Sequence, residues 1–193
     1  SQDHKEGKFT ISIDDEDCHT AIENRLIKSL GDTGSKIHTG RSRNDQVLVA
    51  LRLYYKSSLS EISSITNQCI EHLQMFGDNN NFDFPGYTHM QKAMPSNIKI
   101  WSNAFADSFV DDLKNLKNVQ HIIDQNPLGS GAGYPIPLTI DRESTTSELG
   151  FNKIQSNPIY CQISRGKFEA LIVDSLSQIC LLYTSPSPRD KTV

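Results

Sequence analysis

The 193-residue sequence lacks features that would place it in a membrane, outside the cell or around a metal ion. No apolar run approaches the roughly 18 residues that a spanning helix needs, and Ser1 is not followed by the charged and apolar regions of a secretory signal. Four cysteines stand singly, without the spacing of a zinc site or a disulfide framework: Cys18, Cys69, Cys161 and Cys180. We therefore expect a cytoplasmic protein with no metal and no membrane contact.

An excess of positive charge is also missing. Nineteen Lys and Arg residues face 23 Asp and Glu residues, which gives a formal net charge of -4. This balance argues against a general polyanion-binding surface, so we expect no nucleic-acid partner. With 36% hydrophobic and 22% charged residues, the composition is globular and excludes a disordered chain, and the length suits one ordinary domain.

Strand patterns longer than four or five residues are absent, and apolar residues recur instead at intervals of three and four. This periodicity predicts an all-α fold with helices over about 14–30, 42–76, 95–125, 141–149 and 164–179. At ~1.5 Å per residue, the helix over 42–76 would be ~50 Å long, more than a chain of this size can cover by itself. Partner helices from elsewhere, and hence a bundle, are implied.

Two other stretches interrupt the helical pattern. The Gly/Pro-rich segment 128–137 could be a phosphate-binding loop, but it lacks the Walker lysine and follows no parallel strand, which favours a plain connection between helices. From Cys180 a Ser/Pro-rich string replaces the amphipathic pattern, and its prolines forbid a helix there. We expect a lead-in at 1–13, a helical domain at 14–179 and a non-native tail at 180–193, with a phosphorylation segment as the alternative for the tail.

Two polar clusters lie at helix junctions, at 38–46 and at 86–91. In the first, unpaired N–H groups at a helix start, two arginines and the side chains of Ser42 and Asn44 would suit a substrate with several carboxylates. The alternative is a capping box, since Ser42 and Asp45 have its spacing. The two interpretations are compatible, because a cap also orients the first helical turn.

The second cluster contains His89 beside a hydroxyl side chain in a loop. An imidazole titrates near neutral pH, so His89 is a candidate for proton transfer, with turn stabilisation or plain exposure as the alternatives. His19, next to Cys18, has the same two interpretations with weaker support.

Several stretches together carry a resemblance to a known family. They read Asp-Glu-Asp-Cys-His-Thr-Ala-Ile-Glu at 15–23, His-Thr-Gly-Arg-Ser-Arg-Asn-Asp-Gln-Val at 38–47 and Pro-Gly-Tyr-Thr-His-Met-Gln at 85–91. Pro-Leu-Gly-Ser-Gly-Ala at 127–132 and Ile-Asp-Arg-Glu at 140–143 follow in order. In these motifs, which span about residues 7–179, the chain resembles the argininosuccinate lyases of the fumarase/aspartase superfamily.

The resemblance implies a long-helix bundle of the fumarase/aspartase type, incomplete at both ends, from a homotetramer whose active sites combine three chains. The implied reaction is reversible β-elimination of argininosuccinate to arginine and fumarate in arginine synthesis, without a metal or organic cofactor. Carried over by position, Ser42, Arg43 and Asn44 would contact the carboxylate end of the substrate. Thr88 would hold a carboxylate, and His89 would serve in proton transfer.

The chain also departs from the family pattern. The loop that carries the serine usually assigned as the base, Gly-Ser-Ser-x-Met-Pro-x-Lys, does not occur, and neither does an N-terminal segment with further substrate contacts. We therefore expect the 193-residue chain to be inactive alone. Ser-Arg-Gly-Lys-Phe at 164–168 replaces a Ser-x-Arg-Asp-Phe pattern, which leaves the role of Arg165 open. Two alternatives are a sibling fumarate-releasing lyase and a non-catalytic, crystallin-like structural derivative.

Overall fold

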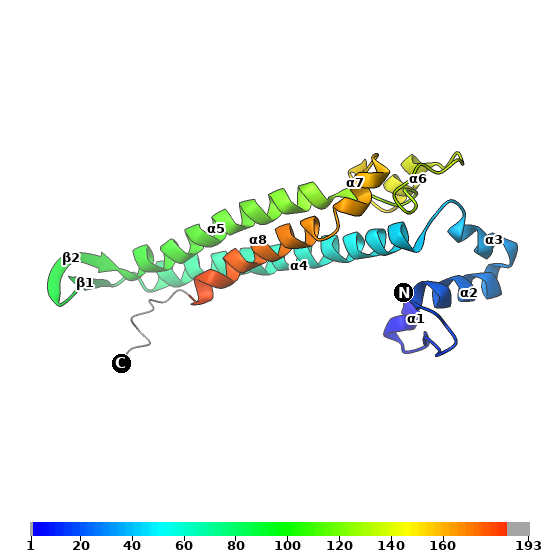
Figure 1. The fold of residues 1–193 in the computed structure, drawn as a ribbon. Helices are drawn as coiled ribbons and strands as arrows, with labels where there is room; N and C mark the ends of the chain where they lie inside the picture. Colours follow the sequence, from blue (N-terminus) through cyan, green and yellow to red (C-terminus); the bar gives the residue numbers. More distant parts are fainter. Residues whose placement is uncertain (1, 185–193) are drawn as a thin grey trace. The chain divides into compact units, whose positions relative to one another are not determined.

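The computed structural model describes residues 2–184, which fold as two compact units (Figure 1). The first unit comprises the residues up to Val49, Asn126–Gly150 and Ile154–Gln162, and the second comprises Ala50–Gln125, Phe151–Lys153 and the residues from Ile163 onward. Helices dominate both, and the strands of the described residues form two small two-stranded sheets. The predicted all-α, long-helix fold is confirmed. Within residues 2–184, no helix combines the length and apolarity needed to cross a membrane.

Long helices build the second unit: most of α4 (Arg43–Asn79), all of α5 (Ile98–Ile123) and α8 (Lys167–Thr184). In Figure 1, α5 and α8 run along α4. Ile70 of α4 packs with Ala106 and Leu113 of α5 in a buried cluster. On α8, Phe168 is buried, and its ring centroid lies 4.8 Å from the guanidinium carbon of Arg52 of α4. Because the apolar positions of each helix recur every three or four residues, one face of each helix closes this core.

Helix α4 is longer than the sequence predicts. The predicted end at about residue 76 is too early, since the helix continues through Gly77 to Asn79. A Cβ atom at residue 77 would lie 2.3 Å from the Oγ atom of the buried Ser102 in α5. Gly77 therefore permits a close approach of the two helices and does not end the first of them.

A hairpin occupies residues 83–97, most of which the sequence predicts to be irregular. Strand β1 (Asp83–Thr88) pairs antiparallel with β2 (Gln91–Asn97), with an irregularity between Pro85 and Tyr87. The expectation of no strands and of a helix from about residue 95 is wrong here, because α5 begins only after its N-cap, Asn97. Most residues of both strands are exposed, so the alternation of apolar and polar side chains that reveals a half-buried strand is missing.

The first unit holds shorter elements: α1 (Gln2–Lys5), α2 (Cys18–Leu30), α3 (Asp32–Ser35), η1 (Lys36–His38), α6 (Arg142–Glu148) and α7 (Pro158–Ile163). Helix α2 begins four residues later than predicted, because Asp17 is its N-cap and accepts a hydrogen bond from the Thr20 N–H at 2.7 Å. Gly31 ends α2 with a φ of 57°, as predicted. Helices α3 and η1 lie in the predicted loop after Gly31, and α7 was not predicted.

The remaining features of the described chain are a second two-stranded sheet and the end of α8. Strand β3 (Gln125–Asn126) pairs with β4 (Lys153–Ile154). Helix α8 continues to Thr184 and corrects the predicted break at Cys180, because no proline lies between Lys167 and Pro186 and a helix commonly ends before the residue preceding proline. Most of the expected non-native tail, residues 185–193, lies outside the described residues.

Candidate active site

The start of α4 forms a hydrogen-bonded first turn around Ser42. The Ser42 N–H donates to Oδ1 of Asp45 at 2.9 Å. The backbone N–H and the side-chain amide of Asn44 approach Ser42 Oγ at 3.3 and 3.2 Å. The capping contact between Ser42 and Asp45 is thus present. All three candidate substrate-binding residues of this turn, including Arg43, are half-buried.

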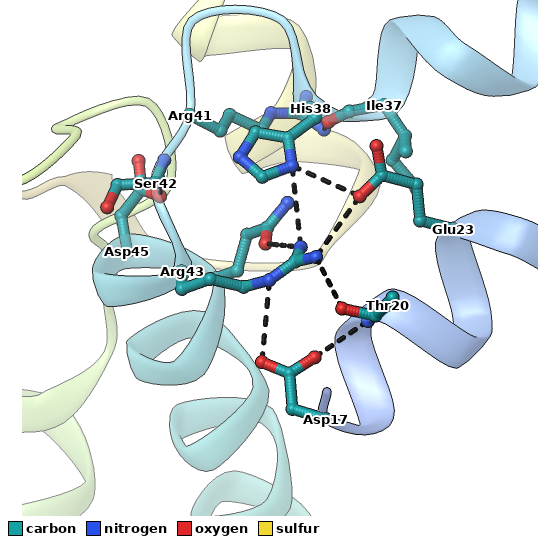
Figure 2. Close-up of polar contacts among 10 residues, drawn as sticks. Asp17, Thr20, Glu23, Ile37, His38, Arg41, Ser42, Arg43 and Asp45 are labelled. Carbon is teal, nitrogen blue, oxygen red and sulfur yellow. Dashed lines mark hydrogen bonds and ion pairs between the residues drawn. The ribbon is translucent and has the colours of Figure 1, made fainter. Parts of the chain in front are cut away.

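Arg43 reaches from this turn to α2 (Figure 2). Its Nη1 donates to Oε1 of Gln46 at 2.9 Å, and its Nη2 donates to Oγ1 of Thr20 at 3.1 Å and to Oε2 of Glu23 at 3.2 Å. Its Nε lies 3.4 Å from Oδ2 of Asp17. The guanidinium therefore joins α2 to α4, and a substrate carboxylate would have to compete with Asp17 and Glu23 for it.

His38 completes this network. Its Nδ1 lies 3.1 Å from Oε2 of Glu23 and 3.4 Å from Nη1 of Arg43. The hydrogen bond with His38 and the neighbouring Arg43 hold the pKa of Glu23 below its usual value, against the opposing effect of partial burial. The backbone N–H of Thr20 is the main cause that lowers the pKa of Asp17, and Arg43 and His19 add to it. Both carboxylates are therefore held in the charged form that Arg43 requires.

The sequence pattern alone gave no role to the residues of α2 and η1 that contact Arg43. Asp17, Thr20, Glu23 and His38 all lie in the two motif stretches 15–23 and 38–47. The spacing of Asp17 and Thr20 is that of a helix cap, which was a readable signal. The pairing of Glu23 with Arg43 crosses 20 residues, and no local spacing rule predicts it.

Asp45 connects the first turn of α4 to the glycine-rich segment. Its side chain is fully buried, and its Oδ2 accepts the backbone N–H groups of Gly129 at 2.9 Å and Gly131 at 2.8 Å. Backbone N–H groups of the glycine-rich segment thus do bind an anion, but this anion is a carboxylate of the chain itself. The sequence alone predicts Asp45 only as part of a cap.

Thr88 and His89 lie at the tip of the β1–β2 hairpin, and both are exposed. Thr88 ends β1 and pairs with Gln91, so His89 and Met90 form a two-residue turn. His89 has a φ of 54°, and it is the one residue other than glycine with positive φ in the part of the chain that the structure describes. This conformation costs a non-glycine residue roughly 1–2 kcal/mol, and strain of this kind clusters at functional sites.

The candidate residues thus fall into two groups. Ser42, Arg43 and Asn44 meet in the first unit, while Thr88 and His89 meet in the second. Arg165 is exposed between α7 and α8. Among residues 2–184, no cluster of three or more His, Cys, Asp or Glu side chains has the arrangement to hold a metal ion.

A family model described as Lyase matches residues 1–181. The chain belongs to this lyase family. Among curated relatives named argininosuccinate lyase, the protein from Thermotoga neapolitana is 55% identical over 176 residues, which are 91% of this chain and 44% of the relative. That from Xylella fastidiosa (strain Temecula1) is 44% identical over 182 residues, 94% of this chain and 41% of the relative. The resemblance to argininosuccinate lyases is confirmed, and the chain spans less than half the length of these relatives.

Solved structures show the same fold in more distant lyases. The crystal structure of EDDS lyase in complex with formate has a TM-score of 0.68 and 20% identity, and it covers 88% of this chain and 36% of its own. A fumarate lyase:delta crystallin from Brucella melitensis bound to cobalt has a TM-score of 0.64 and 22% identity, over 88% of this chain and 43% of its own. At identities of 20% and 22%, these structures show only that the fold is shared.

Proposed function

We propose that this chain supplies the central part of an argininosuccinate lyase, which splits argininosuccinate into arginine and fumarate by reversible β-elimination. The observation that carries the proposal is the 55% identity with the Thermotoga neapolitana argininosuccinate lyase over 91% of the chain. The donor-rich first turn of α4 supports it, since it offers the groups that a substrate with several carboxylates requires. A cytoplasmic role in arginine synthesis belongs to the same proposal.

The chemistry requires charge stabilisation at one carboxylate. A base removes a proton from the carbon next to this carboxylate, and the electron pair of the broken C–H bond moves onto the carboxylate. When the pair returns to form the C=C bond of fumarate, the C–N bond breaks and a general acid protonates the departing guanidinium nitrogen. Donors that are already oriented toward the growing negative charge lower this barrier most effectively.

The start of α4 provides such donors. They are side-chain donors, because the backbone N–H groups of Ser42 and Asn44 already bond to Asp45 and Ser42, and the positive end of the helix adds its attraction for an anion. In this proposal Ser42, Arg43 and Asn44 contact the carboxylate end of the substrate. The network of Asp17, Glu23 and Thr20 holds the Arg43 side chain in one orientation.

We assign proton transfer to His89 and a carboxylate contact to Thr88. The exposed hairpin tip presents both side chains outward from the second unit. The left-handed backbone of His89 supports a functional role, because a turn selected for stability alone would favour Gly or Asn at this position.

In the proposal, the two groups of residues meet in active sites that several subunits of a homotetramer share. Helix α4 supports such an assembly, because it exposes large apolar side chains on the face away from the core: Tyr54 66%, Ile65 57% and Met75 50%. Apolar faces of this extent mark association surfaces. Val173 of α8, 65% exposed, extends the apolar surface of the second unit.

A chimera tests the proposal. This chain replaces the matching segment of the Thermotoga neapolitana argininosuccinate lyase, and fumarate release is followed with argininosuccinate, aspartate and adenylosuccinate. We expect turnover of argininosuccinate only. Turnover of another substrate would favour the sibling lyase, and an assembled but inactive chimera would favour the structural derivative. The 193-residue chain alone should release no fumarate.

The role of His89 is tested in the same chimera. His89→Asn keeps a residue that tolerates the left-handed turn but removes the titrating imidazole, so kcat should fall by at least about 10²-fold. His121→Asn, at an exposed histidine of α5, is the matched control and should retain the parent activity. A His89→Asn enzyme with the turnover of its parent would remove His89 from the mechanism.

A further inference from the structure

We propose that Asp45 is the positioning residue of this active site, which fixes Ser42, Arg43 and Asn44 on the glycine-rich loop 128–133; this inference rests on the proposed function. Asp45 cannot itself reach a substrate, because its side chain is fully buried. It acts through the backbone of the residues that precede it in the sequence.

The carboxylate of Asp45 has a donor on each of its oxygens. Oδ1 accepts the N–H of Ser42 at 2.9 Å, and Oδ2 accepts those of Gly129 and Gly131 at 2.9 and 2.8 Å. Burying a carboxylate is costly unless its oxygens receive hydrogen bonds, and bonds to a charged acceptor are stronger than neutral ones. The three N–H groups and the positive end of α4 provide this compensation. The Asp45 carboxylate therefore joins the first turn of α4 to Gly129 and Gly131, which lie 84 and 86 residues later in the chain.

The loop has the backbone shape of an anion site. Gly129 and Gly131 have φ values of 83° and 62°, in the left-handed region. Left-handed residues within such a turn direct successive backbone N–H groups toward one point, where an anion binds. A Cβ atom at residue 129 would also lie 3.1 Å from Cγ of Arg142. The glycines thus shape a cradle, and Asp45 fills it.

The loop is held from its other side as well. Arg142 donates from Nε to the Leu128 carbonyl at 2.9 Å, and from Nη2 to the carbonyls of Asn126 and Gln155 at 3.2 and 3.0 Å. The Gln162 side chain donates to the Gly131 carbonyl at 3.3 Å. With its N–H and C=O groups both engaged, the loop is a fixed platform.

A second contact holds the segment before α4 against Ile140, which follows the glycine-rich segment. A Cβ atom at Gly40 would lie 2.2 Å from Cδ1 of Ile140, so the backbone before Ser42 presses against this side chain. Together with Asp45, this contact determines where the first turn of α4 lies. Because a displacement of about 1 Å in a positioning group can reduce turnover about 10²-fold, losing one of the two anchors should reduce catalysis.

The test compares two substitutions of Asp45 in the active chimera. Asp45→Asn keeps one acceptor oxygen but turns an NH₂ group toward an N–H donor, and Asp45→Ala removes both acceptors. We expect kcat per folded tetramer to fall about 10²-fold for Asn and further for Ala, while KM rises less. A residue that only stabilises the fold would lower the folded fraction and leave kcat per folded tetramer unchanged.

Two further measurements separate positioning from stability. Cys161→Ala removes a fully buried side chain of α7 in the same unit, and it should lower the melting temperature but keep kcat. Hydrogen exchange should accelerate in 128–132 and 42–46 of Asp45→Asn and stay unchanged in α5. An Asp45→Asn enzyme with parental kcat, or with unchanged exchange in both segments, would overturn the inference. An inactive parent chimera would overturn the proposed function, and this inference with it, before any Asp45 variant is made.

Discussion

The two compact units treat their charged groups in opposite ways. In the first unit, hydrogen bonds and an arginine lower the pKa values of Glu23 and Asp17, and the buried Asp45 has donors on both oxygens. In the second unit, burial and the neighbouring Asp111 raise the pKa of Asp112, whose Oδ2 is buried without a hydrogen-bond partner in the described residues. The contrast concerns these carboxylates, since Asp17, Glu23 and Asp45 of the first unit accept hydrogen bonds, whereas Oδ2 of Asp112 has no partner among the described residues.

Within the second unit, large apolar side chains lie both in the interior and on the outer face. On α4, Leu59 is 2% exposed and packs inside, while Ile65, less than two turns later, is 57% exposed. A helix that is apolar on two faces needs a second partner. Helix α4 of the second unit thus has a buried apolar face and an exposed one.

The largest effect should come from the exposed face of α4. We expect the 193-residue chain to self-associate, and Ile65→Asp should shift it to smaller species, with the dissociation constant raised at least about tenfold, since burying one such side chain contributes about 1.5–3 kcal/mol. Sedimentation velocity measures this. Leu59→Ala should act differently and lower the unfolding free energy by about 2–5 kcal/mol.

Ser60→Asp is the control for this prediction, because it adds the same charge at an exposed polar position of α4. It should leave association unchanged. If Ile65→Asp sediments like the parent chain, the outer face of α4 is not an association surface.

A smaller effect is expected in the first unit. The folded-state pKa of Glu23 lies below its ordinary value of 4.5, so its interactions stabilise the fold above that pH and are lost as the pH falls through the folded pKa. Glu23→Gln should lower the unfolding free energy by about 1 kcal/mol at pH 7 and should weaken its decline on acidification. Urea unfolding at neutral and acidic pH measures both changes.

Glu61→Gln, at an exposed position of α4, serves as the comparison for Glu23→Gln. It should cost less stability at pH 7 than the change at Glu23. Equal stability losses in the two variants would mean that the contacts of Glu23 with His38 and Arg43 contribute little to the first unit.

Local sequence signals predicted where the helices of both units lie, but they did not predict which residues the helices contact. The Gly31 stop and the three-to-four spacing along α4 lie within a few residues of the structure they specify, whereas the Asp17 cap was missed and the helix was predicted to start at residue 14. The hairpin escaped prediction, because backbone pairing between exposed strands leaves no apolar alternation in the sequence. The end of α4 was placed too early, at about residue 76, because the role of Gly77 depends on its contact with Ser102 of another helix.

The candidate site divides in the same way. Ser42, Arg43, Asn44 and His89 became candidates through motifs, which carry no information on geometry. The bond from Asp45 to Gly129 crosses 84 residues, and the strained turn at His89 depends on the hairpin register. Such facts depend on how distant segments fold together, which composition and periodicity do not encode.

The smallest effect tests the unsatisfied carboxylate of the second unit. Because the folded pKa of Asp112 is raised, its ionised form opposes folding once the pH exceeds the ordinary value of 3.8, and the whole penalty is present at pH 7. Asp112→Asn should therefore raise the unfolding free energy by about 0.5 kcal/mol at pH 7. Asp111→Asn should change stability less, because it relieves the repulsion of Asp112 but also removes an exposed ion pair with Lys114 at 2.8 Å. Urea unfolding of both variants decides the matter, and a loss of stability in Asp112→Asn would mean that this carboxylate has a stabilising partner, as the carboxylates of the first unit have.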